Sequence, residues 1–239
     1  MLQFDQLTYL DMPNTNCKTI SRIILENSDL KLRYYEPNSP LKRQKKVDDI
    51  IFISLHSPIE LWMNSYYKFC NKRGLLYQKY SGVQELKEGN IGEVRHFEMF
   101  IKMVFDIKNS KIISSSYYKF RSLGLGLQSL RFLNLSVSEF AYLNKTIRSV
   151  GDLKYIIQNY SVVDFILNSD YIERDLEIFN QNFLAGVLRL QHIDWNSYSA
   201  LLLPDYKKLG FSMLEIEKVT RDLILESERL IPTLEKDCK

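Results

Sequence analysis

The sequence has little of several features that mark specialised classes of protein. Its three cysteines, Cys17, Cys70 and Cys238, lie far apart and in no metal-ligand spacing, which argues against both a disulfide framework and a cysteine metal site. The formal net charge is only +3, so nothing favours binding to nucleic acid or to a membrane surface. No apolar run approaches the roughly 18 residues of a membrane span, and the first residues carry acids where a signal peptide would be apolar. We therefore expect a cytoplasmic protein without a membrane span.

What is present is the composition of an ordinary globular protein. Hydrophobic residues make up 45% and charged residues 26% of the 239-residue chain, so a substantial core can be buried. No internal repeat, low-complexity tract or second core is evident. We expect a single domain over residues 1–239, and the sequence gives no indication of its oligomeric state.

The chain opens with a strand, a loop and a helix. Residues 7–12 are predicted to form a short strand and residues 13–18 a loop, after which isoleucines recur at helical spacing up to about residue 27. A helix that begins after such a loop directs its unpaired backbone N–H groups at whatever the loop holds. This segment is therefore the first candidate for an anion-binding site.

A second strand and helix follow. Ile50–Leu55 is almost continuously apolar, as expected for a strand buried on both faces of a parallel sheet. Ser57, Pro58 and Glu60 then occupy the N-cap, first and third positions of a helix with a capping box. Because ligands of open α/β sheets bind at the carboxyl ends of the strands, we expect this half of the chain to carry the function.

The rest of the chain is predicted to be mostly helical. A third buried strand is expected over residues 162–167, and helices over residues 93–107, 120–133, 152–160 and 171–179, with a last helix opened by Ser212 and Glu215. The sequence thus predicts an α/β fold with a central parallel sheet flanked by helices and a helix-rich C-terminal half.

Three segments resemble conserved motifs of sulfotransferases, especially the carbohydrate branch. Residues 10–20, Leu-Asp-Met-Pro-Asn-Thr-Asn-Cys-Lys-Thr-Ile, are similar to Ile-Pro-Lys-Thr-Gly-Gly-Thr-Ser, which cradles the 5′-phosphosulfate of the donor 3′-phosphoadenosine-5′-phosphosulfate. Residues 52–67, Phe-Ile-Ser-Leu-His-Ser-Pro-Ile-Glu-Leu-Trp-Met-Asn-Ser-Tyr-Tyr, are similar to Val-Arg-Asp-Pro-Tyr-Glu-Arg-Phe-Val-Ser-Ala-Tyr, which holds the donor's 3′-phosphate. Residues 163–176 resemble a third segment that begins Val-Asp-Phe-Val and leads into an acidic helix. The resemblance implies a P-loop-type nucleotide-binding fold.

In the first motif the chain departs from the family where the family carries charge. Aligned on Pro13, the family lysine falls on Asn14, and its Thr-Ser pair falls on Lys18 and Thr19. Lys18 can replace the missing cation by reaching the bridging or sulfuryl oxygens; the alternative is an exposed lysine at a helix start. The resemblance implies that the donor is bound by Pro13, Asn14, Thr15, Asn16, Cys17, Lys18 and Thr19.

In the second motif the family arginine falls on His56 and the phosphate-binding serine on Asn64, which is followed by Ser65. A neutral imidazole offers one donor where a guanidinium offers a forked set, so the contact to the 3′-phosphate should be weaker. The alternative for His56 is a structural histidine in a turn. Asn64 can still donate to a phosphate oxygen, as a serine does.

Sulfuryl transfer needs an in-line acceptor hydroxyl, a general base, and donors for the charge on the leaving phosphate. His96 and Glu93 lie one turn apart on the helix predicted over residues 93–107, and by residue type they are the best candidates for the base. The alternative is that both are surface residues of an amphipathic helix. Lys18, His96 and Glu93 are thus the predicted catalytic residues.

Three functional hypotheses follow. The first is a sulfotransferase that moves a sulfuryl group from 3′-phosphoadenosine-5′-phosphosulfate to a hydroxyl of a glycan or small acceptor, with no metal. The second is a catalytically impaired binding protein that kept the fold, because both family cations are absent from their usual places. The third is a P-loop kinase using Lys18 and Thr19, but Met12 and Cys17 replace the P-loop glycines and Ser57 stands where an acid would hold the metal.

Overall fold

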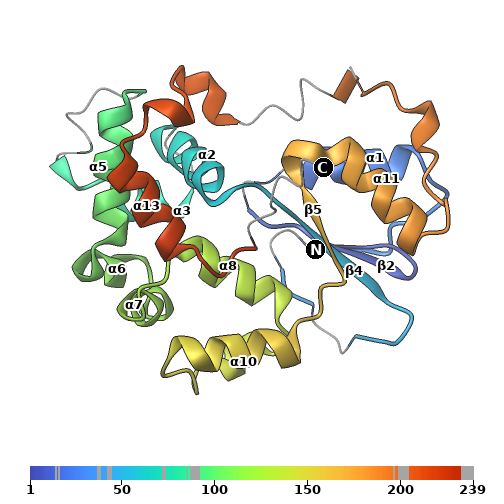
Figure 1. Ribbon diagram of the computed structural model, residues 1–239, viewed down its shortest axis with the longest axis horizontal. Helices are drawn as coiled ribbons and strands as arrows, with labels where there is room; N and C mark the ends of the chain where they lie inside the picture. Colours follow the sequence, from blue (N-terminus) through green and yellow to red (C-terminus); the bar gives the residue numbers. More distant parts are fainter. Residues whose placement is uncertain are drawn as a thin grey trace. The chain divides into compact units, whose positions relative to one another are not determined.

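The computed structural model describes residues 1–13, 15, 17–36, 39–41, 45–71, 74–84, 86, 92–195, 197–198 and 205–232 (Figure 1). The chain forms two compact units. Unit 1 comprises Met1–His56 and Phe132–Leu203, and unit 2 comprises Ser57–Arg131 and Pro204–Lys239. That the chain is a single domain stays a prediction. Among the described helices, none has the length and apolar character needed to cross a membrane.

Unit 1 is built on a five-stranded sheet, which confirms the α/β class. The strand order is β3 (Tyr34–Tyr35), β1 (Leu2–Gln3), β2 (Leu7–Leu10), β4 (Ile50–Leu55) and β5 (Phe165–Asn168). β2, β4 and β5 are parallel, whereas β1 pairs antiparallel with β2 and β3. The sheet is therefore mixed rather than wholly parallel. Three residues join β1 to β2, too few for the crossover that a parallel pair needs.

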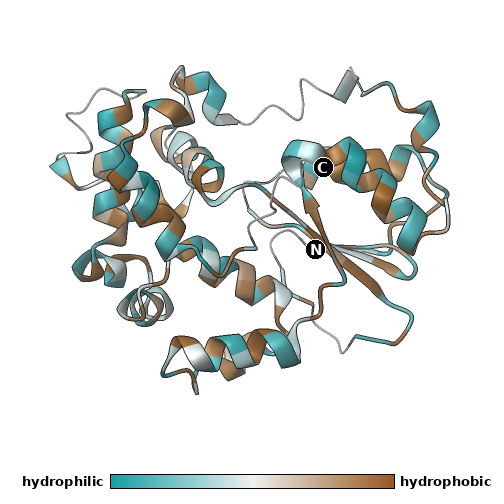
Figure 2. Cartoon of the chain, viewed as in Figure 1, coloured by the Kyte–Doolittle hydropathy of each residue, from teal (hydrophilic) through white to brown (hydrophobic). Residues whose placement is uncertain are grey.

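An aromatic cluster of unit 1 packs on one face of this sheet, and residues of the opposite face, such as Ile51 and Ile53, are also buried. Tyr9 of β2 stacks on Phe52 of β4 at 4.8 Å between ring centroids, and Phe52 lies 4.7 Å from Phe179. β4 and β5 are drawn largely in the hydrophobic colour in Figure 2, although β4 lies inside the sheet and β5 at its edge. The described helices and 3₁₀ turns of unit 1 include α1 (Cys17–Glu26), α9 (Phe140–Leu143), α10 (Val150–Tyr160), η1 (Ser169–Tyr171), α11 (Ile172–Phe183) and η2 (Leu190–His192). Among them, α1 and α11 contribute most to this cluster.

Unit 2 is helical, and its core is aromatic. Trp62, Tyr66 and Phe97 are fully buried. The Phe100 ring lies 5.5 Å from the Tyr66 ring and 6.2 Å from that of Trp62. The described helices and turns of unit 2 are α2 (Pro58–Cys70), α3 (Leu75–Tyr80), α5 (Val94–Phe105), α6 (Ile107–Ile113), α7 (Ser115–Ser122), the start of α8 (Leu127–Ser136), η3 (Asp205–Leu209), η4 (Met213–Glu215) and α13 (Lys218–Ser227).

Two predicted helices are wrong in their bounds. The helix expected over residues 120–133 is two helices, because α7 ends at Ser122, Gly124 adopts a left-handed φ of +75°, and α8 begins at Leu127. The capping box of Ser212 and Glu215 does form, but it opens the short turn η4, and α13 begins only at Lys218. The capping-box pattern therefore predicts where a helical turn begins but not how long the helical segment is.

A buried carboxylate closes the N-terminal end of α8 in unit 2. Oε1 of Glu228 accepts hydrogen bonds from the Trp62 indole N–H (2.8 Å) and the Gln128 amide (3.1 Å), and Oε2 accepts one from the Ser129 amide (2.6 Å). Burial raises the pKa of the Glu228 carboxyl above its ordinary value, although these hydrogen bonds act in the opposite direction. Gly126 leaves room for this carboxylate, since a Cβ there would lie 2.0 Å from Oε1.

The raised pKa of Glu228 predicts a pH-dependent stability. When the pKa of a group is higher in the folded than in the unfolded state, the group stabilises the fold at pH values below its unfolded-state pKa. This contribution is lost as the pH rises through the folded-state pKa. The variant Glu228→Gln cannot titrate at this position. The free energy of unfolding of the parent, minus that of the variant, should therefore fall as the pH rises above the ordinary glutamate pKa of about 4.3. Urea unfolding of both full chains measures this difference, and a difference that stays constant or grows with pH would contradict it.

Candidate anion-binding site at the carboxyl edge of the sheet

The three parallel strands of unit 1 end at one edge of the sheet. Leu10 pairs with Ile53, and Leu55 pairs with Asn168, so the residues that follow the three strands start from adjacent positions. The described polar residues among them are Asp11 and Thr15 after β2, His56 after β4, and Ser169 and Asp170 after β5. These polar residues occupy the edge where open α/β sheets bind ligands.

The turn between β2 and α1 is closed by Thr15. The Thr15 amide donates to the Met12 carbonyl at 3.3 Å, and the Thr15 hydroxyl donates to the same oxygen at 2.8 Å. Pro13 is the second residue of this four-residue turn, a position that suits its fixed φ. Of the predicted donor-binding residues, Asn14 and Asn16 lie outside the described residues.

The first turn of α1 carries the predicted cation. Cys17 is the first residue of the helix, Lys18 is exposed, and Thr19 is buried. Within the part of the chain that the structure describes, no acid pairs with Lys18. The amino group is therefore available to an anion held at the start of α1, where the helix dipole also favours negative charge.

His56 forms a pair with an acid that follows the neighbouring strand. Its side chain is buried, and Nδ1 lies 3.3 Å from Oδ1 of Asp170. Asp170 is held in turn, because its amide donates to the Asn168 side chain at 3.0 Å and the Asn168 amide donates to Asp175 at 2.7 Å. Asp170 therefore orients the imidazole and carries a negative charge at this edge.

Comparison with family models, curated proteins and solved structures finds no match.

Asn64 and Ser65, predicted to contact the donor, lie in α2 of unit 2. The Asn64 side-chain oxygen accepts a hydrogen bond from the Tyr206 amide at 3.1 Å. The Ser65 hydroxyl donates to the Leu61 carbonyl at 2.8 Å and accepts from the Gln128 side chain at 2.8 Å. Both side chains are buried and serve the packing of unit 2.

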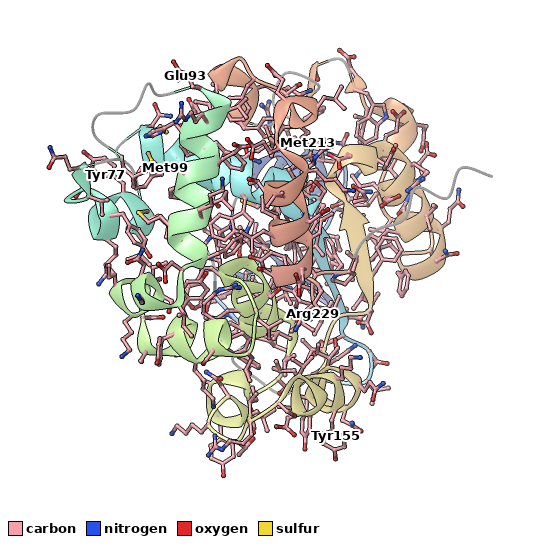
Figure 3. The ribbon with its side chains drawn as sticks, turned by 60° about the vertical axis from the view of Figure 1, so that its left-hand side comes forward. Tyr77, Glu93, Met99, Tyr155, Met213 and Arg229 are labelled. Atoms are coloured by element: carbon pink, nitrogen blue, oxygen red, sulfur yellow. The ribbon has the colours of Figure 1, made fainter. Side chains whose placement is uncertain are left out.

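His96 and Glu93, predicted as the base, also lie in unit 2. His96 is buried, with Nε2 3.2 Å from the Leu86 carbonyl and Nδ1 hydrogen-bonded to the Tyr66 hydroxyl. Because a carbonyl only accepts, Nε2 carries the proton and Nδ1 accepts from Tyr66. Glu93 is exposed at the beginning of α5, where its carbonyl accepts from the amides of His96 and Phe97 (Figure 3). Both ring nitrogens of His96 are engaged inside unit 2, an arrangement that suits a structural role.

Two residues at the sheet edge were missed by the sequence-based prediction. Ser54 is the one polar residue in the otherwise apolar strand Ile50–Leu55, which is a signal that the sequence displays. Its hydroxyl contacts both Tyr9 and Thr15. Asp170 follows the third strand, but only the pairing of β4 with β5 brings it to His56.

Proposed function

We propose that unit 1 binds the phosphate groups of a nucleotide at the turn between β2 and α1, and that the protein is a sulfotransferase with a P-loop-type fold. The donor is 3′-phosphoadenosine-5′-phosphosulfate, and the acceptor is a hydroxyl of a glycan or small molecule. The observation that carries the proposal is the exposed Lys18 on the first turn of α1, directly after the turn closed by Thr15. Among the described residues, no acid pairs with it. We infer the identity of the ligand from the resemblance of residues 10–20 and 52–67 to the two donor-binding motifs.

The reaction requires little covalent chemistry from the protein. The acceptor oxygen forms a bond to sulfur while the bond from sulfur to the bridging phosphate oxygen breaks, and the electron pair stays on the leaving phosphate. Lys18 and the amides of the first turn of α1 stabilise the charge that develops there. We assign the contact with the 3′-phosphate to His56, which follows the neighbouring strand β4, and the acceptor proton passes to a general base.

A second candidate function is that of a catalytically impaired binding protein, which keeps the fold but transfers no sulfuryl group. It is favoured by Asp170, whose carboxylate lies against His56 and opposes the approach of a phosphate. Transfer of labelled sulfate from the donor to a panel of saccharides distinguishes the two functions, since only the sulfotransferase gives labelled product.

Calorimetric titration with adenosine 3′,5′-bisphosphate, the product nucleotide, tests the proposed donor site. We expect binding that is at least about tenfold tighter than that of adenosine 5′-monophosphate, because a charge-assisted hydrogen bond to the 3′-phosphate contributes roughly 1.5–3 kcal/mol. Absence of heat at millimolar nucleotide would rule out the donor site. Equal affinity for the two nucleotides would leave His56 without its assigned role.

A further inference from the structure

A chain of three hydroxyl groups runs from the core of unit 1 to the turn between β2 and α1. The Tyr9 hydroxyl lies 2.5 Å from the Ser54 hydroxyl, which lies 3.1 Å from that of Thr15. Tyr9 and Ser54 are fully buried, on β2 and β4. The chain thus ties the turn to both central strands.

The direction of every hydrogen bond in this chain can be assigned. The Thr15 proton points to the Met12 carbonyl, so Thr15 accepts from Ser54. The only Ser54 proton is used in that bond, so Tyr9 must donate to Ser54. Burial, together with the nearby Cys17, raises the pKa of Tyr9 well above its ordinary value, and Tyr9 therefore keeps its proton. All three protons point outward, toward the turn.

We infer that Tyr9 and Ser54 are positioning residues that orient Thr15 as a hydrogen-bond donor toward an anion bound at the turn. This inference rests on the proposed function. On binding, the Thr15 hydroxyl turns from the Met12 carbonyl to a phosphate or sulfate oxygen, while the two bonds behind it stay as they are. A hydroxyl that accepts one hydrogen bond donates the next more strongly. The chain therefore favours an acceptor such as a phosphate oxygen over a donor such as an ammonium group.

Three variants separate positioning from structural support. Ser54→Ala removes the bond to Thr15 and takes one of its two hydroxyl partners, Ser54 and Thr15, from the buried Tyr9. We expect a cost of about 1 kcal/mol of stability. The double variant Tyr9→Phe with Ser54→Ala removes both partners and should recover most of that stability. Tyr9→Phe alone leaves the Ser54–Thr15 bond in place.

The measurement is the Kd for adenosine 3′,5′-bisphosphate beside the free energy of unfolding in urea. We expect Ser54→Ala and the double variant to raise Kd by the same factor, about five- to tenfold, despite their different stabilities. Tyr9→Phe should raise it about twofold or less. Thr15→Val should weaken binding at least as much as Ser54→Ala, and Thr15→Ser, which keeps the hydroxyl, should restore it.

The outcomes distinguish this inference from the proposed function. If the parent protein binds the bisphosphate and the stable double variant binds it equally well, the positioning role is wrong and the donor site stands. If the parent binds inorganic sulfate with the predicted sensitivity to Ser54→Ala but does not bind the bisphosphate, the positioning role stands and the proposed donor is wrong. If it binds neither ligand, both are wrong.

Discussion

Gly126→Ala is expected to destabilise unit 2 by roughly 3 kcal/mol or more, the largest effect on stability that we predict. The new Cβ would lie 2.0 Å from Oε1 and 2.3 Å from Cδ of Glu228, so the carboxylate has to leave its place. Its departure leaves three buried donors without their hydrogen-bond acceptor: the Trp62 indole N–H and the backbone amides of Gln128 and Ser129. Urea unfolding of the full chain followed by tryptophan fluorescence measures the loss.

Two comparisons test the cause of this loss. Gly82→Ala, in the same unit, is the matched control, because a Cβ there meets nothing within 4 Å, and its effect should stay below about 1 kcal/mol. In a Glu228→Ala background the clash is gone, so adding Gly126→Ala should cost little more. An equal cost of Gly126→Ala in both backgrounds would show that Glu228 is not the reason for the glycine.

Lys18→Ala is expected to weaken binding of adenosine 3′,5′-bisphosphate by about ten- to 100-fold, the largest effect on function that we predict. Lys18 is exposed on the first turn of α1, and within the described residues no acid neutralises it. A charge-assisted contact from its amino group to the 5′-phosphate would account for that factor. Calorimetric titration of the variant beside the parent measures it.

Lys31→Ala provides the control for general electrostatics. Lys31 is also an exposed lysine of unit 1, but it lies beyond the C-terminal end of α1, whereas Lys18 lies in the first turn of that helix. Its removal changes the net charge by the same amount and should leave Kd within about twofold. If Lys18→Ala binds like the parent, or if both variants lose affinity equally, Lys18 is not the cation of the site.

Much of unit 1 could be predicted because its elements are local in the sequence. The apolar run Ile50–Leu55 is β4, and the isoleucines after residue 17 form the buried face of α1. The two-residue strands β1 and β3 carry no pattern of their own, since their hydrogen bonds are made to residues far along the chain. The predicted helix over residues 120–133 is interrupted at Gly124, whose left-handed φ of +75° ends α7 before α8 begins.

The candidate site was predictable only in part, for a similar reason. The rule that ligands bind where parallel strands end placed Thr15, Lys18 and His56 at one edge. The partners of these residues come from pairing between strands: Ser54 is 39 residues from Thr15, and Asp170 is 114 residues from His56. The spacing of Glu93 and His96 showed their helical turn but not that Tyr66 and Leu86 engage the imidazole.

A crystal soaked with adenosine 3′,5′-bisphosphate tests most directly whether an anion binds at the turn between β2 and α1. We predict electron density for the 5′-phosphate within about 2.7–3.2 Å of the amide nitrogens of the first turn of α1 and of Nζ of Lys18. Nucleotide density elsewhere on the chain, with no phosphate oxygen against residues 13–19, would contradict the proposed site.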